Sequence, residues 1–152
     1  MIRIICVGKI KEKYFVDAIN EYKKRIGKFS KLEIIELSDE ATNDSNIALL
    51  KEKEKILKIL KTTDYNIALD INGEMIDSVE FSNKINNIFT NHNSNITFII
   101  GGSCGLANEI KNMCDYKLSF SKMTFPHQLF RVILLEQIYR AFKILNNESY
   151  HK

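Results

Sequence analysis

The segment from residue 119 to residue 140 reads SFSKMTFPHQLFRVILLEQIYR, and it constrains most strongly what this chain can fold into. It contains Pro126, the only proline of the chain, and proline suits the first turn of a helix. We therefore predict a helix over residues 126–145. Apolar side chains lie on nearly every side of this helix, although it also carries two arginines and a glutamate. Such a helix has to be covered on more than one face, and we expect a second copy of the chain to be one cover.

Strand and helix patterns alternate along the whole chain. Strands are predicted over Ile2–Val7, Leu32–Leu37, 66–70, Ile96–Ile100 and 115–119, and helices over Lys13–Ile26, 47–60, 78–89, 106–113 and 126–145. This alternation predicts an α/β fold, with a mostly parallel sheet and helices on both faces. The 152 residues suffice for one domain with its own core, so we expect a single domain over residues 1–152.

The composition is that of an ordinary globular protein, with 45% apolar residues, 27% charged residues and a net charge of +3. This mild charge permits an anionic partner, but it lacks the density of a dedicated nucleic-acid binder. No apolar run approaches the roughly 20 residues that cross a bilayer, and the N-terminus is typical of a first strand. We therefore expect a cytoplasmic protein. The three cysteines have no C-x-x-C spacing, so neither a disulfide framework nor a metal site is predicted.

Three unusual loops, at residues 68–74, 100–106 and 120–127, follow predicted strands. Ligands of parallel α/β sheets bind beyond the carboxyl ends of the strands, where these loops should lie. The second loop, IGGSCGL, is rich in glycine and presents N–H groups before a helix. Turn chemistry alone would explain Asn72-Gly73 and Gly101-Gly102. It would not explain the third loop, whose polar and large apolar residues are suited to a pocket for a partly apolar ligand.

Two other functions are compatible with these loops. Ser103 is the centre of a G-x-S-x-G motif between a strand and a helix, and Asp115 and His127 follow in the order of a serine hydrolase. This motif also arises easily in any glycine-rich turn. The second alternative is a non-catalytic module that binds RNA or ribosomes, in which the three loops are purely structural.

The resemblance to a known family rests on five sequence motifs. They are ALDING at 68–73, FIIGGSCGL at 98–106, LSFSKMTFPHQLFR at 118–131, EQIYRA at 136–141 and the ending YHK. In these motifs the chain closely resembles the SPOUT-class methyltransferases, and within them the ribosomal RNA large subunit methyltransferase H family. The match in chain length and in the order of the motifs extends over the whole chain.

The resemblance implies a C-terminal trefoil knot, a homodimer, and S-adenosylmethionine bound in the knot loops. It also implies methylation of N3 of a pseudouridine in the 23S RNA of the large subunit, on the assembled ribosome. The cofactor contacts of the family carry over to Leu69, Gly101, Phe120, Ser121, Lys122, Met123, Thr124 and Phe125.

Removing the proton from N3 calls for a general base, or for a charge that stabilises the resulting anion. His127 is one candidate, because histidine exchanges a proton near neutral pH, but it could equally be a packed residue at the start of the helix. Arg140, four residues after Glu136, is either a helical ion pair or an arginine aimed at phosphate or base oxygens. For Tyr150 and His151, the resemblance implies a tail folded over the cofactor pocket of the same chain or of a partner.

Overall fold

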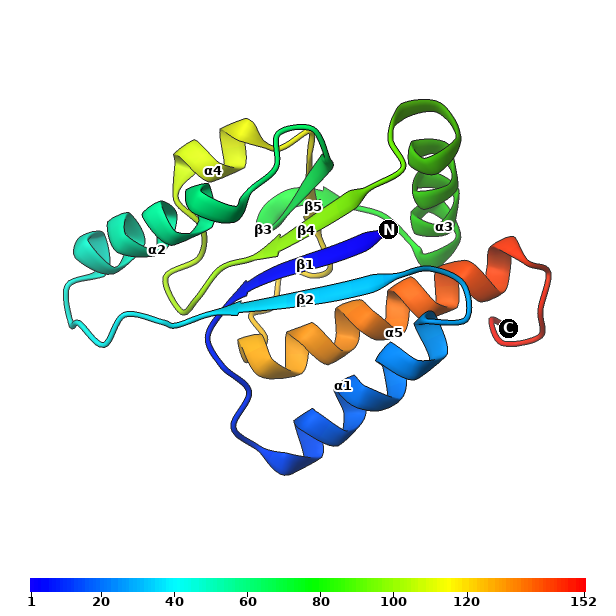
Figure 1. Ribbon diagram of the computed structural model, residues 1–152, viewed down its shortest axis with the longest axis horizontal. Coiled ribbons are helices and arrows are strands. Elements are labelled where there is room, and N and C mark those ends of the chain that lie inside the picture. Colours follow the sequence, from blue (N-terminus) through cyan, green and yellow to red (C-terminus); the bar gives the residue numbers. More distant parts are fainter.

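The computed structural model describes all 152 residues and contains one five-stranded sheet. Its strands are β1 (Ile2–Val7), β2 (Leu32–Leu37), β3 (Tyr65–Met75), β4 (Ile96–Ile100) and β5 (Tyr116–Ser119). Their order across the sheet is β2-β1-β4-β3-β5, and every neighbouring pair is parallel (Figure 1). The predicted parallel α/β architecture is therefore confirmed. The trefoil knot implied by the resemblance stays a prediction.

Five α-helices cover the two faces of the sheet, as predicted. Helices α1 (Lys13–Ile26), α3 (Ser78–Asn87) and α5 (His127–Leu145) pack on one face, and α2 (Ser45–Ile59) and α4 (Asn108–Met113) on the other (Figure 1). All six residues of β1 are buried, because alternate side chains enter the two helical layers. An ion pair of 3.0 Å between Lys53 and Glu109 joins α2 to α4.

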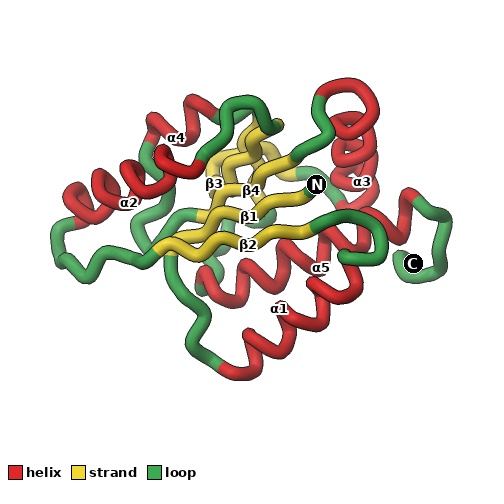
Figure 2. The backbone as a smooth tube through the Cα atoms, in the orientation of Figure 1, coloured by secondary structure: helices red, strands yellow, loops and turns green.

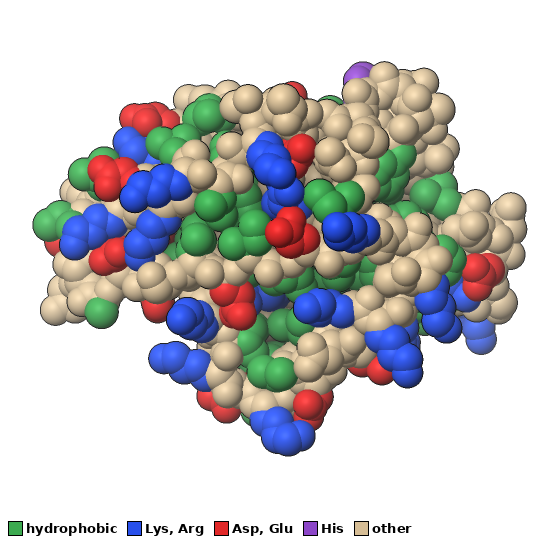
Figure 3. All heavy atoms as spheres, in the orientation of Figure 1, with side chains coloured by type: hydrophobic (Ala, Val, Ile, Leu, Met, Phe, Trp, Pro, Cys, Tyr) green, Lys and Arg blue, Asp and Glu red, His purple; other side chains and the backbone are tan.

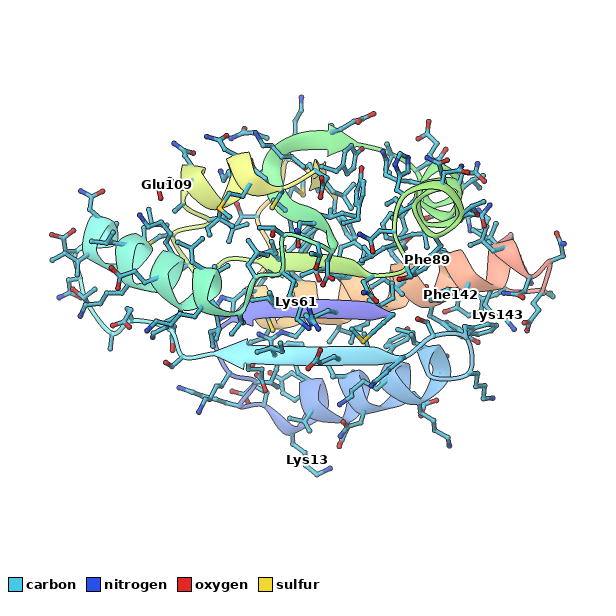
Figure 4. The ribbon with its side chains drawn as sticks, turned by 45° about the horizontal axis from the view of Figure 1, so that its top comes forward. Lys13, Lys61, Phe89, Glu109, Phe142 and Lys143 are labelled. Carbon is cyan, nitrogen blue, oxygen red and sulfur yellow. The ribbon has the colours of Figure 1, made fainter.

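Helix α5 lies between α1 and α3, with its inner side on the sheet. Its buried apolar residues are Leu134, Leu135, Ile138, Ala141 and Phe142. The ring of Phe142 stacks on Phe29 at 5.5 Å, in the layer that α1 and α5 form (Figure 4). Neighbours from the same chain thus account for much of the apolar character of α5. Leu129 remains 37% exposed on the outer side, and cover by a second copy stays a prediction. No helix is both long and apolar enough to span a membrane.

The main difference from the predicted elements is the length of β3, which continues to Met75 rather than ending at residue 70. Beyond the irregularity at residues 69–74, Glu74 pairs with Leu118 and Met75 with Ser119. Gly73 permits this second pairing, because a Cβ there would lie 2.7 Å from the carbonyl carbon and oxygen of Lys117. The sequence after residue 70 did not predict a strand. This part of β3 pairs along only one edge, with β5.

Candidate functional site

The three loops singled out in the sequence line one cavity of about 350 Å³ at the carboxyl edge of the sheet. In Figure 2, the loop that follows β4, which is the second of the three, leaves the sheet at this edge, together with the loops that follow β1 and β2. The expectation that the three loops converge is therefore confirmed. Seven of the eight predicted cofactor contacts line the cavity: Leu69, Gly101, Phe120, Ser121, Met123, Thr124 and Phe125. The eighth, Lys122, is exposed and does not line it.

Sequence reasoning missed several residues of this cavity, among them Lys111 and Phe130. Lys111 extends from α4 and its ammonium lies 3.2 Å from the carboxylate of Asp70, which belongs to the first loop. The N–H of Asn72 donates to the same carboxylate at 3.3 Å. The opposite charges of residues 70 and 111 were the only sequence signal for this pair, since the two are distant along the chain.

Aromatic rings form an apolar wall of the cavity. The ring of Phe130 lies edge-on to Phe120 at 5.1 Å and stacks on Phe125 at 6.1 Å. Such pairs hold rings in fixed orientations, which gives a flat surface for a planar ligand group. Met123 is 74% exposed at the same loop, so its thioether side chain can move over a ligand.

The loop at residues 120–126 leaves backbone donors free. The hydroxyl of Ser119 donates to the carbonyl of Ser121 at 3.1 Å, and the Ser121 hydroxyl accepts from the N–H of Met123 at 3.0 Å. The N–H groups of Lys122 and Thr124 have no acceptor within the chain. Free backbone donors beside an apolar wall match the usual make-up of small-molecule sites.

The glycine-rich loop is a tight turn that only small residues fit. The N–H of Gly105 donates to the carbonyl of Gly102 at 3.0 Å, and Gly105 has a φ of +78°. A Cβ at Gly101 would lie 2.4 Å from the carbonyl oxygen of Gly105. The turn therefore brings bare backbone to the cavity, with the N–H groups of Ser103 and Cys104 unpaired.

His127, the first residue of α5, lines the cavity and is half-buried. Its ring packs on Gly8, where a Cβ would lie only 3.0 Å from Nε2. One turn later, Arg131 is buried and donates to Glu36 at 2.8 Å and to the Gly8 carbonyl at 3.0 Å. The histidine is therefore packed at the start of the helix and also reaches the cavity, and its role as a general base stays a prediction.

Arg140, Tyr150 and His151 form a second cluster, away from the cavity of their own chain. Arg140 donates to Glu136 Oε1 from Nε at 3.0 Å and from Nη2 at 2.7 Å, and its Nη1 lies 3.2 Å from Nδ1 of His151. The hydroxyl of Tyr150 donates to the same Glu136 oxygen at 3.1 Å. Burial and this carboxylate raise the pKa of Tyr150 to about 12. The tail is therefore docked on its own helix in a defined geometry.

The two clusters lie toward opposite ends of α5. His127 and Arg140 are thirteen positions apart, which at ~1.5 Å per residue corresponds to about 20 Å along the helix. The tail of a chain therefore does not fold over that chain's own cavity, which is one of the two alternatives that the sequence left open.

The hydrolase alternative finds no support in the geometry. Asp115 precedes β5 at the opposite edge of the sheet, where its carboxylate accepts from the N–H of Asn66 at 2.7 Å. The Ser103 hydroxyl approaches only the thiol of Cys104, at 3.9 Å. The three residues of a hydrolase triad are therefore not assembled. No group of three or more His, Cys, Asp and Glu side chains is placed to hold a metal ion.

Fold and cavity together define an α/β protein whose ligand site is built from three loops at the carboxyl edge of a parallel sheet. The profile of a family described as "Predicted SPOUT methyltransferase" matches residues 1–151. The chain therefore belongs to the SPOUT methyltransferase family.

The curated relatives include proteins named ribosomal RNA large subunit methyltransferase H from Clostridium botulinum and Clostridium perfringens. Each is 55% identical to this chain, over 99% of both sequences. Among solved structures, a probable methylase family protein from Haemophilus influenzae matches with a TM-score of 0.60 at 18% identity, over 99% of this chain and 70% of its own. The tRNA (m1G37) methyltransferase of Aquifex aeolicus matches with a TM-score of 0.52 at 12% identity, over 91% of this chain and 69% of its own. These two structures support the fold alone.

Proposed function

We propose that this protein transfers a methyl group from S-adenosylmethionine to N3 of a pseudouridine in the 23S RNA of the large subunit, on assembled ribosomes in the cytoplasm. The observation that carries the proposal is the full-length identity of 55% to proteins named ribosomal RNA large subunit methyltransferase H. The convergence of the three loops on one cavity supports it. The choice of pseudouridine N3 as the methylated atom, and of the assembled ribosome as the substrate, rests on the family resemblance.

The cavity suits the proposed cofactor. The aromatic wall of Phe120, Phe125 and Phe130 offers a surface for an adenine ring. The free N–H groups of the third loop can donate to ring nitrogens or to a carboxylate, and Asp70 can accept from hydroxyls. When bound, S-adenosylmethionine supplies a methyl group on a positively charged sulfur. The protein's task is to hold the acceptor nitrogen in line with it, and positioning of this kind can contribute roughly 7–11 kcal/mol.

His127 and Arg140 contribute to one site only if two chains supply them, because they are separated along α5. A homodimer with its α5 helices antiparallel would bring the Arg140 end of one helix to the His127 end of the other. In this arrangement His127 takes the N3 proton, and Arg140, held by Glu136, faces phosphate or base oxygens. Tyr150 and His151 then close the cavity of the partner.

The test is transfer of labelled methyl from S-adenosylmethionine to intact ribosomes, separated subunits and free ribosomal RNA, with mass mapping of the product. We expect one large-subunit pseudouridine to be methylated in ribosomes. Free RNA should be a poor substrate, because a net charge of +3 gives little attraction to unstructured RNA. Efficient methylation of a short transcript at physiological salt would contradict the ribosome requirement. Absence of cofactor binding would favour the non-catalytic module instead.

A further inference from the structure

Glu52 is a buried acidic residue that the proposed reaction does not use. It lies on the inner face of α2, where Ala48, Glu52 and Ile56 are the three buried residues, spaced one turn apart. Only 6% of Glu52 is exposed. Its neighbours on this face are small or apolar, as expected for a helix that packs on a sheet. An ionisable group at such a position needs a separate explanation.

The carboxyl of Glu52 lacks adequate partners within the chain. Oε2 is buried without any hydrogen bond, and Oε1 receives only the N–H of Glu40 at 3.5 Å, the limit for such a bond. Lys55, one turn further along α2, is engaged by Glu40 and Ser38. Burial is the main cause that raises the pKa of Glu52, and it outweighs the lowering by the Glu40 N–H and by the charge of Lys55. A buried acceptor without a donor lowers stability, so its partner should be found in another state of the molecule.

The group that Glu52 faces is the glycine-rich turn of the cavity. A Cβ at Gly102 would lie 3.2 Å from both carboxylate oxygens and 3.1 Å from Val7. Glu52 does not line the cavity, whereas residues 100–106 all do. The turn therefore separates Glu52 from the ligand space by a single layer of backbone. The N–H groups of Ser103 and Cys104, in the same turn, are unpaired.

We propose that Glu52 is a positioning residue, whose buried carboxyl accepts hydrogen bonds from the backbone N–H groups of Ser103 and Cys104 when cofactor fills the cavity. The unpaired oxygen of Glu52 and the unpaired donors of the turn are complementary, and Gly102 places no side chain between them. Formation of these bonds on ligand binding would fix the backbone that contacts the cofactor. This inference rests on the proposed function, since it assigns the cofactor to this cavity.

The experiment compares Glu52→Met and Glu52→Gln with a matched control, Glu54→Gln. Glu54 lies on the same helix but is exposed, so this control removes the same charge without touching the turn. The probe is S-adenosylhomocysteine, with its Kd measured by calorimetry and the fold checked by urea unfolding. We expect Glu52→Met to weaken binding about tenfold or more, the effect of losing a hydrogen bond to a charged group. Glu52→Gln, which keeps one acceptor oxygen, should be intermediate.

A purely structural carboxyl would behave differently. Loss of a purely structural group would lower both the stability of the protein and its affinity for the probe. We expect Glu52→Met to be as stable in urea as the wild type, because the carboxyl is unsatisfied in the free protein. Failure of both Glu52 variants to fold would assign the residue to the core and overturn the proposal. Binding of the probe by Glu52→Met within about twofold of wild type would overturn it as well.

Cys104 provides a second readout inside the turn. It is the exposed cysteine, whereas burial raises the pKa of Cys6 to about 12 and of Cys114 to about 11, so it should react first with a thiol reagent near pH 8. S-adenosylhomocysteine at a concentration near its wild-type Kd should slow the labelling of Cys104 in the wild type, and much less in Glu52→Met. A wild type that neither binds the probe nor protects Cys104 would overturn the proposed cofactor and this inference together. Binding with equal protection in both proteins would overturn the role of Glu52 alone.

Discussion

At the scale of single residues, Arg131 is the largest side chain that is fully buried. It joins the start of α5 to the carbonyl of Gly8 and to Glu36, whose carboxylate also accepts the N–H of Ile10 at 2.8 Å. We expect Arg131→Ala to lower the free energy of unfolding by about 3 kcal/mol, measured by urea denaturation. The change leaves a cavity and an unpaired Gly8 carbonyl beside His127.

The matched control for this prediction is Arg25→Ala. Arg25 also forms a hydrogen-bonded ion pair, with Glu21 at 2.8 Å, but the two side chains on α1 are 40% and 52% exposed. Exposed pairs of this kind contribute little to stability. The surface view in Figure 3 shows many such lysine, arginine and acidic side chains. Equal losses of stability in the two variants would mean that burial does not determine the importance of Arg131.

The sequence indicated which polar residues are important better than it predicted the residues that they contact. Arg140 and Glu136 were recognised as a pair because residues four apart on a helix are neighbours. Arg131 is one of the two arginines noted in the apolar helix, but its partners, Gly8 just after β1 and Glu36 in β2, belong to distant segments that no local pattern connects to it. No sequence signal singled out Glu52, because it stands between lysines in a charged helix although its side chain faces inward.

At the scale of elements, periodicity located the strands and helices, and failed where pairing across the chain determined their ends. The five apolar residues among the six of β1, and the helical spacing of α1, gave bounds that the structure reproduces. Helix α4 begins at Asn108 rather than at residue 106, because Leu106 is still part of the loop that lines the cavity. The extension of β3 depends on contact with β5, which lies more than forty residues further along the chain.

The C-terminal tail is the element whose removal should separate function from folding. Tyr150 packs edge-on against Tyr139 at 5.0 Å and bonds to Glu136, but most of the tail beyond α5 is exposed. We expect deletion of residues 150–152 to leave urea stability and binding of S-adenosylhomocysteine nearly unchanged, and to reduce methyl transfer to ribosomes at least about a hundredfold. Normal transfer by the truncated protein would show that the tail takes no part in the reaction.

At the scale of the whole molecule, α5 connects a ligand cavity at its first turn to a polar cluster near its end. The family resemblance linked these residues to one reaction, but no sequence pattern could place them about 20 Å apart on one helix. Under the proposed function, a single chain therefore presents two half-sites. Twofold symmetry is the simplest way for half-sites on one helix to meet, since each helix end then faces the other end of its partner.

Mixing two inactive variants tests whether sites are shared between chains. His127→Ala and Arg140→Ala should each abolish methyl transfer. In a heterodimer of the two, one site combines the intact His127 of one chain with the intact Arg140 of the other, and the second site carries both substitutions. After unfolding and refolding an equal mixture, half of the dimers are mixed and half of their sites are complete. About a quarter of wild-type activity should therefore return. If both residues served the cavity of their own chain, every site in the mixture would lack one of them, and no activity would return.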